Sequence, residues 1–269
     1  MRFFFHIGYN GFNYRGWQWQ PGIASVQQVL EATLSQVLKS PATVIGCGRT
    51  DAKVHASQFF FHLDVNEVWD YDLLFRLNKN LPDDIAVFDI IPVDENHHAR
   101  YDAIQRTYDY FIHTYKDPFL SQLSSLYLWK DLNFTEMKRA VALLTRYDDY
   151  RAFCKTPAEY DHTICNVSDA RLYADSRGDI IRFQISANRF LGRMIRIIVG
   201  RLLEIGSGTL TVDEFENYLI TRVTPPIIEP PAYPQGLYLT KVMYPFLDIP
   251  SRTNFINPVL EKAGKWIAV

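Results

Sequence analysis

Long apolar runs are missing from this 269-residue chain. The apolar start, Met1–His6, is much shorter than the core of a signal peptide, and no stretch approaches the length that crosses a bilayer. Cysteine is scarce, and the spacing of Cys47, Cys154 and Cys165 matches neither a disulfide framework nor a zinc site. We therefore expect a soluble cytoplasmic protein with no membrane segment and no metal.

The chain also lacks an excess of charge of one sign, since 28 lysine and arginine residues stand against 30 aspartate and glutamate residues. A net charge of -2 gives no overall attraction to nucleic acid, so any RNA contact depends on local basic patches. No internal repeat is present. Gly11, Gly16 and Gly22 do not have the spacing of a phosphate-binding fingerprint, so no nucleotide cofactor is expected.

What the chain does have is material for a core, with 48% hydrophobic and 14% aromatic residues. Its periodicity predicts strands at Arg2–Tyr9, 42–45, Ser57–Val65, Ile85–Ile91, Arg106–Tyr115, Asp169–Tyr173, Asp179–Ser186 and Gly236–Tyr244. It predicts helices at Ser25–Leu38, Tyr71–Asn80, Thr135–Arg146, Phe190–Ile205 and after a capping box at Thr211–Glu214. A proline-rich connector follows at Pro225–Pro234. Without a regular βαβ repeat, this order favours an α+β fold with helices packed on a largely antiparallel, mixed sheet.

The most informative segment reads Gly48-Arg49-Thr50-Asp51-Ala52-Lys53-Val54-His55-Ala56. It places the carboxylate of Asp51 between Arg49 and Lys53, in a turn between two predicted strands. Residues two apart in an extended chain project to the same side, so the two cations could keep the carboxylate ionised. Two interpretations stay open on this loop alone. Asp51 is either a turn residue paired with Arg49, which is the commoner pattern, or an oriented nucleophile.

The loop resembles the Gly-Arg-Thr-Asp-Ala-Gly-Val-His-Ala signature of the TruA-type tRNA pseudouridine synthases. Further segments similar to that family recur in order along most of the chain: Tyr9–Gln18, Leu81–Val87, His98–Arg100, Arg106–Tyr110, Asn188–Phe190, Met194–Gly200 and Gly236–Leu239. One such match carries little weight, whereas a series in register indicates the family.

The resemblance implies the pseudouridine synthase fold, with two α/β halves around a central cleft. Residues 1–103 would carry the nucleophile loop, and residues 104–269 would complete the RNA-binding cleft. It also implies an isomerase that makes pseudouridine at positions 38, 39 and 40 in the anticodon stem-loop of tRNAs. The family's members are homodimers, so the resemblance implies a homodimer as well.

The same resemblance assigns roles to single residues. It implies that Asp51 is the nucleophile, with Arg49 keeping it ionised, and that Arg196 points into the cleft near Asp51. Tyr108 would stack on the target uracil and offer its hydroxyl for the late proton transfer from C5, and Leu237 would wall the same pocket. From spacing alone, Tyr108 is a core aromatic and Arg49 serves equally well as a phosphate contact.

Other cations are candidates for binding RNA. Arg189, Arg193 and Arg196 recur at spacings that place them on one stripe of the predicted helix, which suits either a phosphate backbone or a solvated face. Arg15 lies with Trp17 and Trp19 in a loop that mixes cations and aromatic rings as single-strand RNA surfaces do, although Trp17 suits a core position equally well. The pair His97-His98 is expected to be structural rather than metal-binding.

Lys53 is the departure from the family pattern, because the family has glycine there. Glycine at such a place often serves a positive φ angle or a close backbone approach, so Lys53 is either strained or used as a contact to an RNA phosphate. We expect the phosphate contact. If Lys53 instead blocks the site, the chain would be a catalytically impaired tRNA-binding paralogue. A hydrolase would need a metal-binding acidic cluster beside Asp51, and the sequence has none there.

Overall fold

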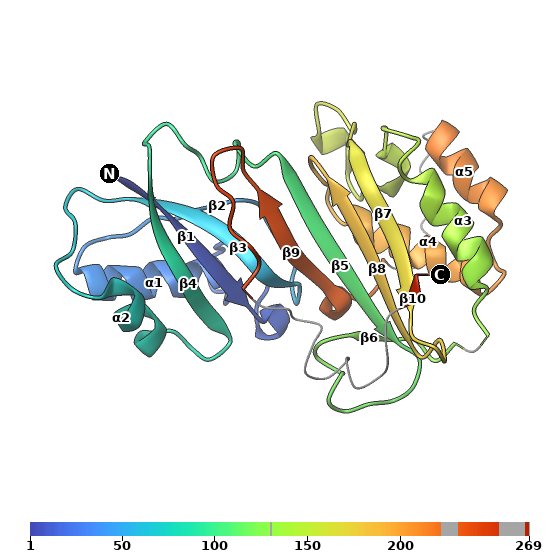
Figure 1. Cartoon of the computed structure of the whole chain (residues 1–269), viewed down its shortest axis with the longest axis horizontal. Helices are drawn as coiled ribbons and strands as arrows, with labels where there is room; N and C mark the ends of the chain where they lie inside the picture. The colour runs from blue at the N-terminus through green and yellow to red at the C-terminus, as the bar shows by residue number, and fades with distance from the viewer. Residues whose placement is uncertain (130, 222–230, 253–266, 269) are drawn as a thin grey trace. The chain divides into compact units, whose positions relative to one another are not determined.

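The computed structural model describes residues 1–129, 131–221, 231–252 and 267–268 (Figure 1). They form two compact units, Met1–Arg106 with Tyr238–Phe255, and Thr107–Leu237 with Ile256–Val269. The sequence placed the boundary near residue 103 and assigned all later residues to the second half. The last long strand instead belongs to the first unit from Tyr238 on, because it pairs there with an earlier strand.

The described residues of the first unit form five strands. They are β1 (Arg2–Tyr9), β2 (Ile45–Gly46), β3 (His55–Asp64), β4 (Ile85–Val93) and β9 (Leu237–Met243), in the order β9-β3-β1-β4 with β2 on β3. Only β9 is parallel to its neighbour β3. The helices are α1 (Val26–Leu38) and α2 (Leu73–Asn80), which pack against each other, and a short 3-10 helix, η1 (Gly11–Asn13), follows β1.

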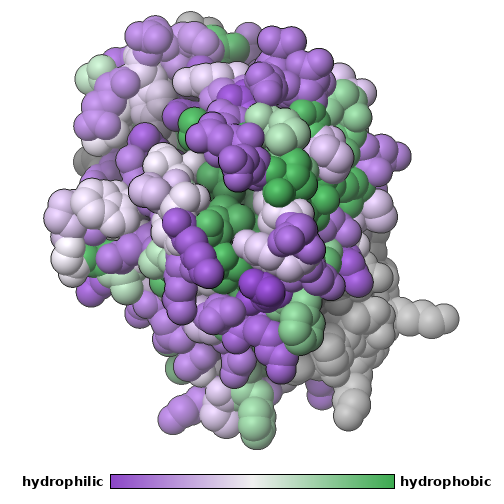
Figure 2. Space-filling view, turned by 90° about the vertical axis from the view of Figure 1, so that its left-hand side faces the viewer, coloured by the Kyte–Doolittle hydropathy of each residue, from purple (hydrophilic) through white to green (hydrophobic). Residues whose placement is uncertain are grey.

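Aromatic side chains fill the core of this unit. Phe5 of β1 lies opposite Phe61 of β3, and their rings stack with centroids 4.7 Å apart. Central strands are buried on both faces, which explains why β1 reads as an apolar run rather than an alternating pattern. Ser25 caps α1 as predicted, since its side chain accepts the backbone N–H of Gln28. On the face drawn in Figure 2, hydrophilic residues surround smaller groups of hydrophobic ones.

The second unit contains β5 (Gln105–His113), β6 (Ser125–Leu126), β7 (Val167–Ala174), β8 (Ile180–Ala187) and β10 (Ile267–Ala268), in the order β10-β7-β8-β5 with β6 on β5. Its helices are α3 (Phe134–Leu143), α4 (Met194–Gly206) and α5 (Val212–Thr221), with 3-10 helices η2 (Arg151–Phe153), η3 (Pro157–Glu159) and η4 (Pro234–Gly236). In Figure 1, α3 lies beside β7, and it packs on that strand, α4 and α5. The predicted α+β class with a largely antiparallel, mixed sheet is confirmed.

The β7–β8 hairpin turns where the sequence predicted. Asp175 accepts the backbone N–H groups of Asp179 and Ile180, and Gly178 provides a positive φ of 73°. The Nε of Arg182 in β8 donates to the carboxylate of buried Asp109 in β5 at 2.7 Å. The capping box that starts α5 is also confirmed, with reciprocal bonds between Thr211 and Glu214. Of the predicted connector Pro225–Pro234, residues 225–230 lie outside the described residues.

None of the described helices is long and apolar enough to cross a bilayer. Within the same described ranges, no three His, Cys, Asp or Glu side chains gather where they could hold a metal ion.

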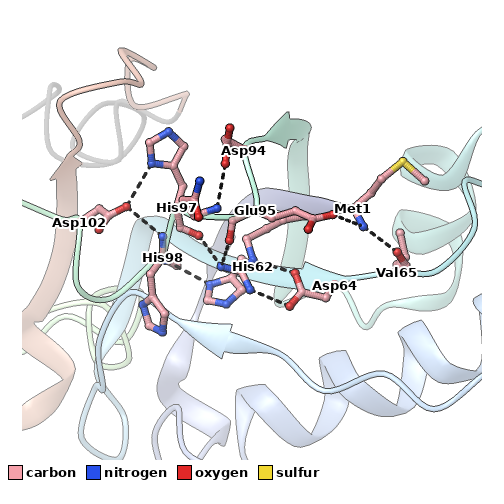
Figure 3. A network of polar contacts seen from close by, with 12 residues as sticks. Met1, His62, Asp64, Val65, Asp94, Glu95, His97, His98 and Asp102 are labelled. Atoms are coloured by element: carbon pink, nitrogen blue, oxygen red, sulfur yellow. Dashed lines mark hydrogen bonds and ion pairs between the residues drawn. The ribbon is translucent and has the colours of Figure 1, made fainter.

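His97 and His98 belong to a network of polar contacts near the start of β1 (Figure 3). The carboxylate of Asp102 accepts the backbone N–H of His98 at 2.9 Å and lies 3.2 Å from the His97 ring. His62 of β3 accepts the backbone N–H of Ala99 at 3.1 Å through Nδ1. His97 and His98 therefore have structural partners, in keeping with the role that the sequence predicted.

We expect the free energy of unfolding to fall as the pH drops from about 6.5 to 4, and His62 to account for part of the fall. Burial lowers the pKa of His62 to about 4. Between about pH 6.5 and pH 4, His62 therefore binds a proton in the unfolded chain but stays neutral in the folded chain. The contribution is complete above pH 6.5 and is at most about 3 kcal/mol. His62→Asn keeps an acceptor for Ala99 but does not titrate, so urea unfolding should show a smaller loss for the variant. Parallel pH curves for both proteins would contradict this expectation.

Candidate active site

The predicted nucleophile lies at the first position of a tight turn. The backbone N–H of Val54 donates to the carbonyl of Asp51 at 3.2 Å, which closes a turn of four residues. Lys53 occupies the third position with a φ of 64°. A positive φ at the third position is what a type II turn requires, and it explains why the resembled family has glycine there.

The charged residues of this turn reach the surface, while its scaffold is buried. Arg49 and Lys53 are exposed, and Asp51 is half-buried. Thr50 is buried between them, and its hydroxyl is hydrogen-bonded to the hydroxyl of Tyr9 at 2.9 Å. The half-buried side chain of Asp51 is thus accessible to solvent while its backbone is held in place. The ion pair between Arg49 and Asp51 stays a prediction.

The segment after β1 holds the turn along its length. The N–H of Trp17 donates to the carbonyl of Thr50 at 3.1 Å, and the N–H of Lys53 donates to the carbonyl of Tyr14 at 3.0 Å. Both bonds use backbone atoms, so they fix the path of the loop whatever its side chains are. Two different parts of the chain thus position Asp51 together.

Two glycines make this close approach possible. A Cβ on Gly16, which has a φ of 99°, would lie 2.4 Å from the carbonyl oxygen of Thr50. A Cβ on Gly11 would lie 1.9 Å from the carbonyl oxygen of Val54, and the N–H of Gly11 donates to Nδ1 of His55 at 3.1 Å. At these two positions only glycine lets one backbone lie against the other.

Asp84, the residue just before β4, supports the same segment. Its carboxylate accepts the hydroxyl of Tyr14 at 2.6 Å, and its carbonyl accepts the N–H of Asn10 at 2.8 Å. Burial, followed by the bond to Asp84, raises the pKa of Tyr14 far above its usual value. Tyr14 therefore stays protonated and serves as a donor that fixes the segment, not as an acid or base.

Arg106 fixes the chain just before the loop. Its Nη2 donates to the carbonyl of Cys47 at 2.7 Å and to that of Arg100 at 2.9 Å. Burial raises the pKa of the Cys47 thiol to about 11, so the thiol stays protonated at neutral pH and does not rival Asp51 as a nucleophile.

In the second unit, Tyr108 of β5 is buried and meets the ring of Phe190 edge to face, with centroids 5.1 Å apart. Such a contact fixes the plane of the tyrosine ring, which a stacking platform for a base needs. Spacing alone made Tyr108 a core aromatic, and its burial agrees with that reading as well.

Arg196 lies in the first turn of α4 and ties down the segment that leads to Leu237. Its Nε donates to the carbonyl of Ala232 at 2.7 Å, and the N–H of Ala232 donates back to the carbonyl of Arg196 at 3.0 Å. The hydroxyl of Tyr110 donates to the carbonyl of Tyr233 at 2.6 Å. Leu237 itself is buried at the start of β9. That these residues meet the nucleophile loop in a cleft stays a prediction.

The predicted arginine stripe is wrong. The sequence placed Arg189, Arg193 and Arg196 on one helix from Phe190, but α4 begins at Met194. Arg193 is its N-cap with a φ of 62°, a left-handed conformation that breaks the helical path. Arg189 precedes the helix, and its Nη1 lies 3.1 Å from Nε2 of the exposed His162. Periodicity could not detect this turn, because its residues have the same apolar spacing as the helix that follows.

The arginine and tryptophan residues that the sequence grouped together in the loop after β1 differ in burial. Trp17 is a core residue whose ring stacks on Phe59 with centroids 4.1 Å apart. Arg15 is exposed, as is Trp19, with 47% of its surface accessible. Arg15 and Trp19 thus remain available to a ligand, and Trp17 does not.

Comparison of this sequence with known proteins shows the family to which the chain belongs. A chain from Porphyromonas gingivalis named tRNA pseudouridine synthase A is 39% identical over 248 residues, which cover 91% of this chain and 97% of the relative. The chain belongs to the tRNA pseudouridine synthase A family. Relatives of the same name from Parabacteroides distasonis (44% identical, 81% of this chain, 86% of the relative) and Gloeobacter violaceus (36%, 93% and 82%) agree. A family model described as tRNA pseudouridine synthase matches residues 140–245.

Membership in the tRNA pseudouridine synthase A family confirms the resemblance on which the site was predicted. It also draws attention to residues to which the sequence analysis assigned no role in the site. Gly11, His55 and Arg106 lie inside recognised segments, yet their spacing alone assigns them no role. The backbone N–H of Gly11 donates to the ring of His55 inside the nucleophile loop, and Arg106 donates to the carbonyl of Cys47, just before that loop. Their place in recognised segments was the one signal that could have found them.

Proposed function

We propose that this chain converts uridine to pseudouridine in the anticodon stem-loop of tRNAs, at positions 38, 39 and 40, with Asp51 as the nucleophile. The observation that carries the proposal is the similarity to tRNA pseudouridine synthases A over nearly the whole chain. The placement of Asp51 in a turn held by backbone contacts supports its role, because a nucleophile needs a fixed approach.

The reaction is an isomerisation in which atoms and charges balance within the substrate. The N1–C1′ bond breaks, the detached uracil rotates, C5 bonds to C1′, and the proton on C5 is lost as N1 gains one. Attack of Asp51 on the sugar, attack on the uracil ring, and proton abstraction that leads to a glycal all start from an ionised carboxylate. No oxidant and no energy source is needed, which fits a chain in which we expect no cofactor.

Side chains of the second unit support the other steps. We assign Tyr108 to stacking on the flipped uracil and to the proton transfer from C5, and Arg196 to the charge of Asp51 and the substrate. Leu237 would exclude water from the detached base. Enzymes that act on a base must take it out of the helix stack, so an aromatic platform of this kind is required. Arg15, Arg189 and Arg193 would bind phosphates.

The test is the release of tritium from unmodified tRNA that carries 5-tritiated uridine, because only C5–C1′ bond formation expels that atom. We expect release that stops when uridines 38 to 40 are replaced by cytidine. Tight binding of the same tRNA without any release would support the impaired paralogue instead.

We also propose that the enzyme works in the cytoplasm as a homodimer. Family membership supports both statements, since its members are homodimers and act on tRNA. Sedimentation equilibrium across a range of protein concentrations tests the second, and a mass that stays at that of a single chain would contradict it.

For Tyr108, we expect Tyr108→Phe to keep tRNA affinity and to lose turnover by about 10²- to 10⁴-fold, the scale of general acid–base catalysis. The phenylalanine ring keeps the edge-to-face contact with Phe190, so the platform survives while the hydroxyl is lost. Tyr108→Ala should weaken tRNA binding as well, because no ring is left for the flipped base. Tritium release and tRNA titration measure the two effects. Normal turnover of the phenylalanine variant would remove the hydroxyl from the mechanism.

A further inference from the structure

Lys53 adopts a backbone conformation that its residue type disfavours. Its φ of 64° lies in the left-handed region of backbone conformation, where Cβ crowds the following carbonyl oxygen. Lys39 has a similar φ of 54°, but it caps the C-terminus of α1, where that conformation is common. Lys53 has no helix end to account for it, and it follows the nucleophile by two residues.

The side chain of Lys53 has a partner within its own unit. Its ammonium lies 4.9 Å from the ring centroid of Phe12, over the ring. A cation in this position is attracted by the negative face of the aromatic ring. Phe12 is held in turn, because it belongs to η1 and its N–H donates to the side chain of Asn10 at 3.1 Å.

We propose that Phe12 and Lys53 form a positioning pair for Asp51. The N–H of Lys53 is bonded to Tyr14 and its ammonium lies on Phe12, so both ends of the residue are attached to the segment that carries η1. The contact offsets the cost of the left-handed backbone and restrains the turn, where the family's glycine leaves the turn free. The pair acts through Asp51, so its kinetic role rests on the function proposed above.

A first experiment tests the pair without any need for activity. Ring currents should shift the ε-methylene protons of Lys53 upfield in the NMR spectrum, and Phe12→Leu should abolish the shift. In unfolding experiments, Phe12→Leu and Lys53→Met should be coupled by about two- to five-fold in the equilibrium constant, the scale of one exposed cation–π contact. An unshifted Lys53 signal together with additive effects would overturn the proposal.

A second experiment tests the kinetic role. Phe12→Leu and Lys53→Met should each lower kcat about two- to five-fold, the double variant should be no worse than either, and tRNA affinity should stay unchanged. Phe12→Tyr keeps an aromatic face and should restore kcat. Lys39→Gly, the matched control, relieves the same backbone conformation and should leave kcat unaltered.

Two results would overturn the kinetic role. If Lys53→Met weakens tRNA binding and flattens its salt dependence while Phe12→Leu changes nothing, Lys53 is the phosphate contact that the sequence predicted. If the effects of the two substitutions on kcat are additive, the residues do not act as a pair. A wild-type protein that releases no tritium refutes the proposed function instead. The ring-current and unfolding results still decide whether the pair exists.

Discussion

Asp51→Asn should abolish pseudouridine formation, by on the order of 10⁴-fold or more, the scale seen when an enzyme loses its nucleophile. Asparagine keeps the shape of the side chain but carries no anionic oxygen with which to attack or to take a proton. The turn itself should survive, because Asp51 closes it through its backbone carbonyl, which accepts the N–H of Val54. Tritium release from unmodified tRNA measures the loss, and tRNA titration should give an affinity close to that of the wild type.

The matched control for this change is Asp83→Asn. Asp83 is exposed, lies in the recognised segment Leu81–Val87, and undergoes the same loss of charge. It should retain full activity, so a general effect of removing one negative charge can be told from the loss of the nucleophile. Turnover by Asp51→Asn clearly above that of a mock preparation would remove Asp51 from the mechanism.

The sequence predicted best those features that neighbouring residues determine. The cap at Ser25 and the box at Thr211 mark helix starts because the bonds that form them join residues three apart. The hairpin of β7 and β8 was found from its turn residues and from alternating apolar positions that share a face. Asp51 was predicted in another way, because its loop is too short to carry a periodicity and only family likeness favoured a nucleophile over a turn residue.

Features that depend on an unusual backbone conformation or on distant residues could not be predicted. The start of α4 is set by the left-handed Arg193, and no pattern in the apolar spacing announces that conformation. The contacts from Gly11, Tyr14 and Trp17 to the nucleophile loop join positions far apart in the chain. Trp17 shows the same limit, because an aromatic residue between polar neighbours suits a core and an RNA surface equally well until its packing is known.

Gly11→Ala should be the most damaging substitution outside the charged residues of the site. The new methyl group would lie 1.9 Å from the carbonyl oxygen and 2.7 Å from the carbonyl carbon of Val54, and both atoms belong to the backbone. No side chain can rotate away, so η1 or the turn after Asp51 must move. The bond from Gly11 to His55 would be strained by the same shift. We expect kcat to fall about 100-fold, the scale of a 1 Å misplacement of reacting groups. We also expect stability to fall by about 1–3 kcal/mol, as for overpacking.

Gly48→Ala separates this steric effect from a general intolerance of the loop. Gly48 precedes Arg49 in the same loop, but a methyl group there would meet only Nε of Arg106, at an ordinary contact distance of 3.9 Å. Its kcat should therefore stay within about three-fold of the wild type, because that contact leaves the turn in place. If Gly11→Ala is as active as Gly48→Ala, the contact between η1 and Val54 does not set the position of Asp51. If Gly11→Ala loses kcat but keeps its tRNA affinity, η1 positions the nucleophile without contributing to RNA binding.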